Sequence, residues 1–118
     1  MRRTIVVLTT LTVAAVASAT ASAQRAQPAL IATVKVSAKE FKFTLSAKTA
    51  KRGVVIFKVT NIGALQHNFQ INGRKTKLLS HGQSDTLRVT FLRKGAYPYK
   101  CTQPGHAAQG MAGVFTIT

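Results

Sequence analysis

Three side chains that bind soft metal ions lie close together near the C-terminus of this 118-residue chain. Cys101, His106 and Met111 occur in the run Cys-Thr-Gln-Pro-Gly-His-Ala-Ala-Gln-Gly-Met. Thiolate and thioether sulfurs are soft donors that suit copper, and imidazole tolerates Cu(II) as well. Copper sites that transfer electrons combine two His and one Cys in a trigonal plane with a weak axial Met. The donor set therefore favours a copper site, provided that the fold supplies a second imidazole.

His67 is the candidate for that imidazole, because it lies in the strand-like segment Leu65-Gln-His-Asn-Phe-Gln-Ile71. Residues 101–111 would form one short loop between the last two strands, so its three donors would share a small volume. Taken singly, a buried Cys, a core Met and a surface His are the ordinary interpretations. Their combination with His67 favours a metal site. The remaining histidine, His81, precedes a turn glycine and is expected at the surface, outside the site.

The first 23 residues have the pattern of a secretory signal peptide. Met1-Arg-Arg is followed by an uncharged apolar stretch and by the small-x-small motif of residues 21–23, which predicts cleavage near Ala23-Gln24. A mature domain of residues 24–118 would then be exported to a periplasmic or other extracytoplasmic compartment. The alternative is a retained N-terminal anchor, although the apolar stretch is shorter than the roughly 20 residues that span a bilayer.

Cys101 is the only cysteine of the chain, so it has no partner for an internal disulfide. Small exported domains usually carry disulfides, because their compartment is oxidising. A free reactive thiol would be a liability there. Export therefore favours a metal ligand at this position, independently of the motif around it.

The predicted mature domain is strongly basic. The whole chain has a formal net charge of +15; without Arg2 and Arg3, 15 basic residues face Glu40 and Asp85, which leaves +13. Such a field repels like proteins and steers anionic partners. The basic residues are scattered along strand-like segments without a recognition helix or zinc-finger spacing, so we do not expect nucleic acid as a partner. We expect a monomer that meets redox proteins with an acidic docking face, or an anionic membrane or cell-envelope surface.

Alternating apolar residues predict an all-β domain. The period-2 pattern of half-buried strands recurs in seven segments: 31–36, 41–45, 55–60, 69–71, 86–91, 97–101 and 114–117. Gly-containing turn signals separate most of these segments, and the one helix-like feature is a possible turn near residues 105–110. Seven or eight short strands in a domain of this length predict a Greek-key β-sandwich.

The two ligand segments resemble those of the cupredoxins, the plastocyanin and azurin family. Residues 97–114 show an aromatic-x-Cys opening, a Pro-Gly-His turn and a Gly-Met-x-Gly close. His67-Asn68-Phe69 is similar to the upstream segment of the family, in which an Asn follows the first His. The four-residue gap from Cys101 to His106 is azurin-like, whereas the gap from His106 to Met111 is plastocyanin-like. These mixed spacings leave the subfamily open.

The resemblance implies a role for each matching residue. His67, Cys101 and His106 would form a trigonal plane around one copper ion that cycles between Cu(I) and Cu(II), and Met111 would be the weak axial contact. Asn68 would support the site through its backbone amide, donating to the thiolate, and through its side chain, bracing the ligand loop. His106 would present its ring edge at the surface as the electron port. Small and apolar residues surround it: Pro104, Gly105, Ala107 and Ala108.

Three functions fit these features. A blue-copper electron carrier would catalyse no substrate turnover, because four ligands leave no open position on the metal; such a protein is not an enzyme. Copper trafficking or storage is the alternative, but the Met- and His-rich tracts that would favour it are missing from the sequence. A β-sandwich binding module without metal is the third possibility. The donor set favours the electron carrier.

Overall fold

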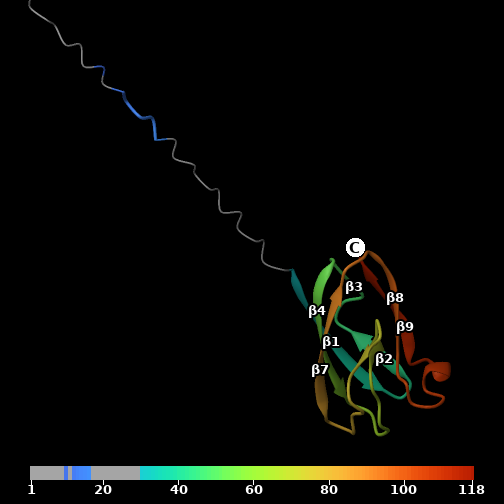
Figure 1. Cartoon of the computed structure of the whole chain (residues 1–118). Coiled ribbons are helices and arrows are strands. Elements are labelled where there is room, and N and C mark those ends of the chain that lie inside the picture. The colour runs from blue at the N-terminus through green and yellow to red at the C-terminus, as the bar shows by residue number, and fades with distance from the viewer. Residues whose placement is uncertain (1–9, 11, 17–29) are drawn as a thin grey trace, which may run out of the picture.

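The structure, a computed structural model, describes residues 10, 12–16 and 30–118. Residues 30–118 form two β-sheets packed face to face (Figure 1). The predicted signal peptide lies outside the described residues, apart from residues 10 and 12–16, which are neither helix nor strand. In the described part of the chain, no helix is long and apolar enough to cross a membrane.

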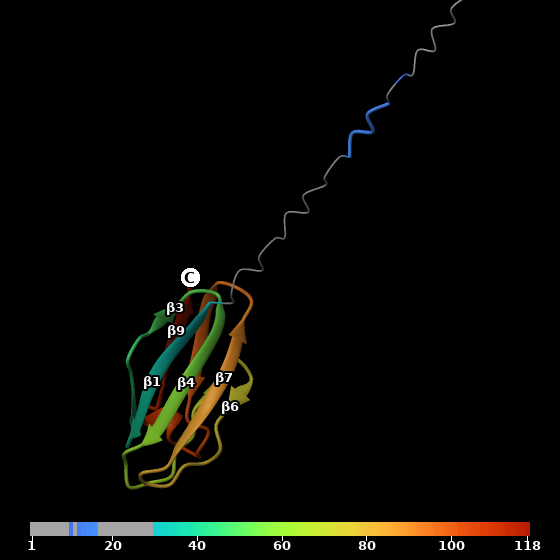
Figure 2. The ribbon, with the colours of Figure 1, turned by 90° about the vertical axis from the view of Figure 1, so that its left-hand side faces the viewer.

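The first sheet contains four strands in the order β2-β1-β4-β7. Their bounds are β1 Ile31–Lys39, β2 Lys42–Leu45, β4 Gly53–Asn61 and β7 Ser84–Phe91. Strand β1 is antiparallel to β2 and parallel to β4, while β4 and β7 are antiparallel. Figure 2 shows β1, β4 and β7 side by side across this layer.

The second sheet contains five strands in the order β3-β9-β8-β5-β6. Their bounds are β3 Thr49–Ala50, β5 Gln70–Ile71, β6 Arg74–Lys75, β8 Gly95–Lys100 and β9 Ala112–Ile117. The long antiparallel pair β8–β9 is connected by residues 101–111, which include the 3₁₀-helix η1 at Ala107–Gln109. The turn predicted near residues 105–110 is therefore confirmed.

The chain crosses repeatedly between the two sheets, and the prediction of an all-β Greek-key β-sandwich is confirmed. Residues 30–118 contain nine strands rather than seven or eight. The two strands that the sequence pattern did not predict are β3 and β6. Each is only two residues long, too short to show an alternation.

The interior between the sheets is built on interlocking phenylalanines. The Phe57 ring of β4 lies 5.2 Å from Phe69, 6.4 Å from Phe91 and 5.3 Å from Phe115, measured between ring centroids. All four side chains are at most 1% exposed. A fully buried Phe stabilises a fold by roughly 1.5–3 kcal/mol through apolar burial. These rings therefore give the loops at the ends of the sandwich a rigid base.

Three connections meet at one end of this sandwich. Because β1 and β4 are parallel, with Ala38 opposite Asn61, the turn after β1 and the loop after β4 leave the sheet at the same edge. The β8–β9 loop lies at this end as well, since the Phe41 ring contacts the His106 ring. The C-terminal Thr118 pairs with Arg52 at the opposite end (Figure 1).

Candidate metal centre

His67 is held at its backbone before any metal is considered. Its N–H donates to the Leu79 carbonyl at 3.1 Å, and its carbonyl accepts from the Leu79 N–H at 2.8 Å. This isolated antiparallel bridge follows the loop after β4, and the His67 side chain is fully buried. The imidazole is therefore fixed in the interior rather than free to turn toward solvent.

The loop of residues 101–111 closes at its base by backbone hydrogen bonds. The Cys101 N–H donates to the Met111 carbonyl at 3.0 Å, and the Met111 N–H donates to the His106 carbonyl at 3.1 Å. Gly110 has a φ of +124°, and a Cβ there would lie 2.9 Å from the Phe41 carbonyl oxygen. Glycine at this position thus permits both the left-handed backbone and the close approach of the β1–β2 turn.

The loop and the bridge bring three donors together. His67 Nδ1 lies 3.1 Å from His106 Nδ1 and 4.0 Å from Cys101 Sγ, and the last two atoms are 3.6 Å apart. With bond lengths typical of Zn²⁺, about 2.0–2.1 Å to nitrogen and about 2.3 Å to sulfur, a trigonal plane separates two nitrogens by about 3.5 Å and nitrogen from sulfur by about 3.8 Å. The three distances therefore suit a metal ion at the centre of the triangle.

The fourth predicted ligand is at the base of the same loop. Met111 is fully buried, and it belongs with Cys101, which is 1% exposed, to the continuous core cluster. A thioether, a thiolate and two imidazoles together make the donor set of a copper site with a weak axial ligand, and the contact of the Met111 sulfur with the metal stays a prediction. The cysteine and methionine side chains of the site are buried, and His106 is partly exposed.

Glu40 is part of this site, although the sequence did not indicate it. Its Oε1 lies 2.8 Å from His67 Nε2, accepts the Leu65 N–H at 2.7 Å, and its Oε2 accepts the Ala64 N–H at 3.2 Å. The pKa of Glu40 is lowered to about 2. The hydrogen bond from the Leu65 N–H is the largest cause, and among the other contacts that lower the pKa those with His67 and Ala64 come next. Because His67 Nδ1 faces the other donors, Nε2 is the nitrogen that carries the hydrogen and donates to the carboxylate.

Asn61 shapes the loop that receives Glu40. This fully buried side chain donates to the carbonyls of Leu65 at 2.8 Å and Leu79 at 2.7 Å, and its Oδ1 accepts the Gly63 N–H at 2.8 Å. A Cβ at Gly63 would collide with the Glu40 carboxylate. The buried asparagine and the glycine thus shape the loop that surrounds the carboxylate.

Asn68 connects the two ligand segments through its side chain. Its Nδ2 donates to Thr102 Oγ1 at 2.6 Å, and its Oδ1 accepts the Thr102 N–H at 2.7 Å. The side chain is 6% exposed. It therefore bonds the segment of His67 to the residue that follows Cys101. Donation from the Asn68 backbone amide to the thiolate stays a prediction.

His106 occupies the outer corner of the donor triangle. Its ring lies 5.1 Å from the Phe41 ring in an edge-to-face arrangement, with an interplanar angle of 73°. Burial, and then the nearby His67, lower the pKa of His106 below its ordinary value, while Glu40 opposes them. The neutral imidazole that a metal requires is therefore favoured. Phe41 extends the apolar surroundings of His106, and only the fold reveals this contact.

His81 lies outside the donor triangle. Its side chain is exposed, as predicted, and its Nδ1 is 2.8 Å from the Gly63 carbonyl oxygen. His81 is a suitable control for His67 and His106, because it has the same imidazole side chain but lies outside the donor triangle.

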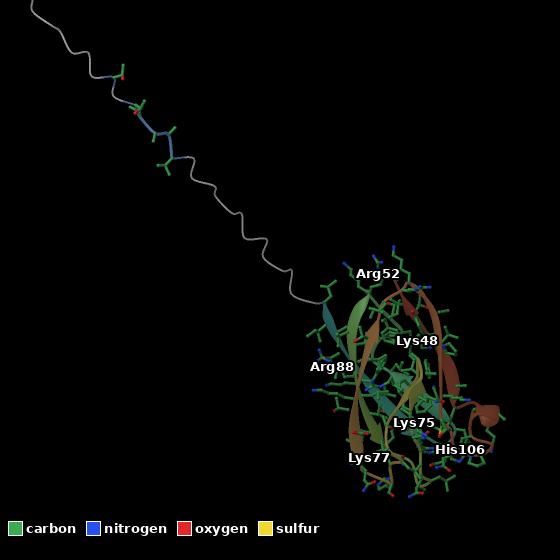
Figure 3. All side chains as sticks on the ribbon, viewed as in Figure 1. Lys48, Arg52, Lys75, Lys77, Arg88 and His106 are labelled. Atoms are coloured by element: carbon green, nitrogen blue, oxygen red, sulfur yellow. The ribbon has the colours of Figure 1, made fainter. Side chains whose placement is uncertain are left out.

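Among the described residues, no lysine or arginine forms an ion pair with a carboxylate. Glu40 is paired with His67, and Asp85 accepts the backbone N–H groups of Lys77 and Thr86. Figure 3 shows the labelled basic side chains spread over both layers, with Arg52 at the end opposite His106. The positive charge therefore surrounds the domain rather than gathering at the site.

A β-sandwich that buries a cysteine between two imidazoles at one end is the architecture of a cupredoxin, a blue copper protein. Residues 30–118 match the family described as copper binding proteins, plastocyanin/azurin family, and the chain therefore belongs to it. The prediction of a cupredoxin with one copper cofactor is confirmed. A comparison with curated proteins gave no match.

Solved structures that share the fold include three auracyanins. Reduced auracyanin from the photosynthetic bacterium Roseiflexus castenholzii is 24% identical, with a TM-score of 0.63 over 73% of this chain and 96% of that one. Auracyanin B is 22% identical, with a TM-score of 0.64 over 80% and 93% of the two chains. Auracyanin A, a "blue" copper protein from Chloroflexus aurantiacus, is 16% identical, with a TM-score of 0.61 over 75% and 99%.

Proposed function

We propose that this blue copper protein is an exported carrier of single electrons, and that His67, Cys101, His106 and Met111 would hold its copper ion. The observation that carries the proposal is the triangle of Cys101 Sγ and the two Nδ1 atoms, with edges of 3.1, 3.6 and 4.0 Å. Bound copper would supply the one-electron Cu(II)/Cu(I) couple. The proximity of donor atoms suits a preformed site.

The residues of the chain would serve electron transfer by keeping the site rigid and dry. The His67–Leu79 bridge and the Cys101–Met111 backbone bond hold three of the ligands on fixed backbone, so little would have to move when the metal changes charge. Four ligands leave no position for a substrate, which supports a carrier rather than an enzyme. His106 is the partly exposed ligand, and we propose its outer edge, beside Phe41, as the route for the electron.

Visible spectra of the copper-loaded domain would test this proposal. We expect an intense blue thiolate-to-copper band in the wild type, no such band in Cys101→Ser, and a lost or altered band in His67→Ala and His106→Ala. His81→Ala is the matched control, because it removes an exposed imidazole outside the triangle and should leave the spectrum unchanged. A Cys101→Ser protein that stays blue would overturn the ligand assignment.

Copper trafficking or storage is the second candidate. It would use the same donors but hold Cu(I) in a colourless form and release it to another protein. The buried Cys101 thiol and the fixed His67 imidazole favour a retained ion over a transferred one. A colourless protein that binds only Cu(I) would favour trafficking, and a domain that binds no copper would leave only a metal-free binding module.

We further propose that residues 1–23 are removed on export and that residues 24–118 form the mature domain. The mass of the exported protein tests this, since a retained N-terminal anchor would leave the full chain.

The unpaired positive charge of the described surface supports redox partners with an acidic docking face. Transfer to such a partner should slow between 0.01 M and 0.15 M salt, as the Debye length falls from about 30 Å to about 8 Å. A rate independent of salt would mean that the charge serves only to hold the protein at an anionic envelope or membrane surface.

A further inference from the structure

One of only two carboxylates in the chain lies against a proposed copper ligand. Glu40 Oε1 accepts from His67 Nε2 at 2.8 Å, on the side of the ring away from Cys101 and His106. In a domain whose other formal charges are almost all positive, this places a negative charge beside the site. The juxtaposition joins residues 27 positions apart in sequence.

The carboxylate is held in place by the protein itself. The Leu65 and Ala64 N–H groups bond its two oxygens, and Asn61 fixes the loop that supplies these amides. Gly63 provides space that a Cβ would take from the carboxylate. The position of Glu40 is thus set by two backbone N–H bonds besides its bond to His67, in a loop that Asn61 fixes and in which Gly63 leaves room, and it does not depend on a metal.

We infer that Glu40 is a positioning residue of the metal centre, which keeps His67 protonated at Nε2 with Nδ1 free for copper, and whose negative charge favours the oxidised ion. This inference rests on the proposed function. Carboxylate partners of ligating histidines fix the tautomer and ring orientation and raise the basicity of the imidazole. A nearby anion stabilises a doubly charged ion more than a singly charged one. Glu40 should therefore lower the reduction potential of the site.

Substitutions can separate the two effects. Glu40→Gln keeps an oxygen that can accept from His67 and Leu65, removes the charge, and sacrifices mainly the longest bond, that to Ala64. Glu40→Leu removes both the acceptor and the charge. Asp85→Asn is the matched control, because it changes the net charge equally and its bonds go to Lys77 and Thr86.

Copper affinities and the reduction potential of each loaded variant provide the first readout. We expect Glu40→Gln to lose more affinity for Cu(II) than for Cu(I), and each tenfold change in that ratio corresponds to a rise of 59 mV for a one-electron couple. Glu40→Leu should lose about 10- to 100-fold in Cu(II) affinity, as is typical when a partner of a ligating histidine is removed. Asp85→Asn should stay near the wild type. Equal potentials in Glu40→Gln and Asp85→Asn would overturn the electrostatic role.

The metal-free protein provides the second readout. In nuclear magnetic resonance spectra of the apo domain, the His67 Nε2–H should exchange slowly with water in the wild type, Glu40→Gln and Asp85→Asn, and rapidly in Glu40→Leu. Unchanged slow exchange in a folded Glu40→Leu protein would overturn the positioning role. A wild type that never turns blue with copper would instead refute the proposed function, so the two failures can be told apart.

Discussion

Removing the Asn68 side chain should measure how strongly the two ligand segments are joined. Asn68→Ala deletes both hydrogen bonds to Thr102, at 2.6 and 2.7 Å, from a nearly buried position. At about 1 kcal/mol net for each bond, we expect a loss of about 2 kcal/mol. For a domain of this size, where each kcal/mol shifts the melting temperature by about 4–8 °C, the metal-free protein should melt about 8–16 °C lower.

A double-mutant cycle with Thr102→Val provides the control. Thr102→Val removes only the Oγ1 acceptor and keeps the bond from its backbone N–H to Asn68 Oδ1. It should cost about half as much, about 1 kcal/mol. Because Asn68→Ala already breaks both bonds, adding Thr102→Val to it should cost little more, and the two effects should not add. A shift below about 2 °C for Asn68→Ala, or full additivity in the cycle, would refute the bracing role.

Three other perturbations address the metal and the buried phenol. Met111→Leu should keep a coloured site but raise its potential, because loss of the proposed Met111 ligand would favour Cu(I); an unchanged potential in cyclic voltammetry would argue against Met111 as a ligand. Stripping copper should make Cys101 reactive to thiol reagents and lower the melting temperature, since a ligand at 1,000 times its Kd stabilises the native state by about 4 kcal/mol; equal labelling and melting with and without copper would mean that Cys101 does not hold the metal. Burial raises the pKa of Tyr99 above its ordinary value of 10. The folded protein thus holds this phenolic proton more tightly than the unfolded chain, so the free energy of unfolding should fall as pH rises above 10. Tyr99→Phe should reduce that loss in denaturant titrations at successive pH values, and an identical pH dependence in both proteins would contradict it.

The metal centre could be predicted largely because its signals are local. Cys101, His106 and Met111 lie on one loop, and a loop of eleven residues can only deliver them to a small volume. The long strands could also be predicted, since the alternation of apolar and polar residues over β1, β4 and β7 follows directly from burial of one face. His67 needed only one further assumption, that a strand-like segment rich in apolar residues is buried.

The contact of Glu40 with His67 could not be predicted, because it depends on the register between two strands. Its carboxylate meets residues 63–67 only because β1 and β4 pair in parallel, with Ala38 opposite Asn61. A single carboxylate after an alternating segment has no periodicity that would distinguish it from a solvated charge. The contact of Phe41 with His106 has the same origin, since the turn after β1 carries both Glu40 and Phe41 to the site.

The absence of lysine and arginine ion pairs in the described part of the chain has a consequence for the response of the fold to salt. Domains with many surface ion pairs lose some stability when salt screens those attractions. Here the surface charges mainly repel one another, so screening by salt should weaken this repulsion, and the melting temperature should rise with ionic strength. A polyanion at the cell envelope would act in the same direction, because its negative groups would neutralise the surface lysines and arginines. Residence at such a surface would then protect the folded carrier as well as localise it.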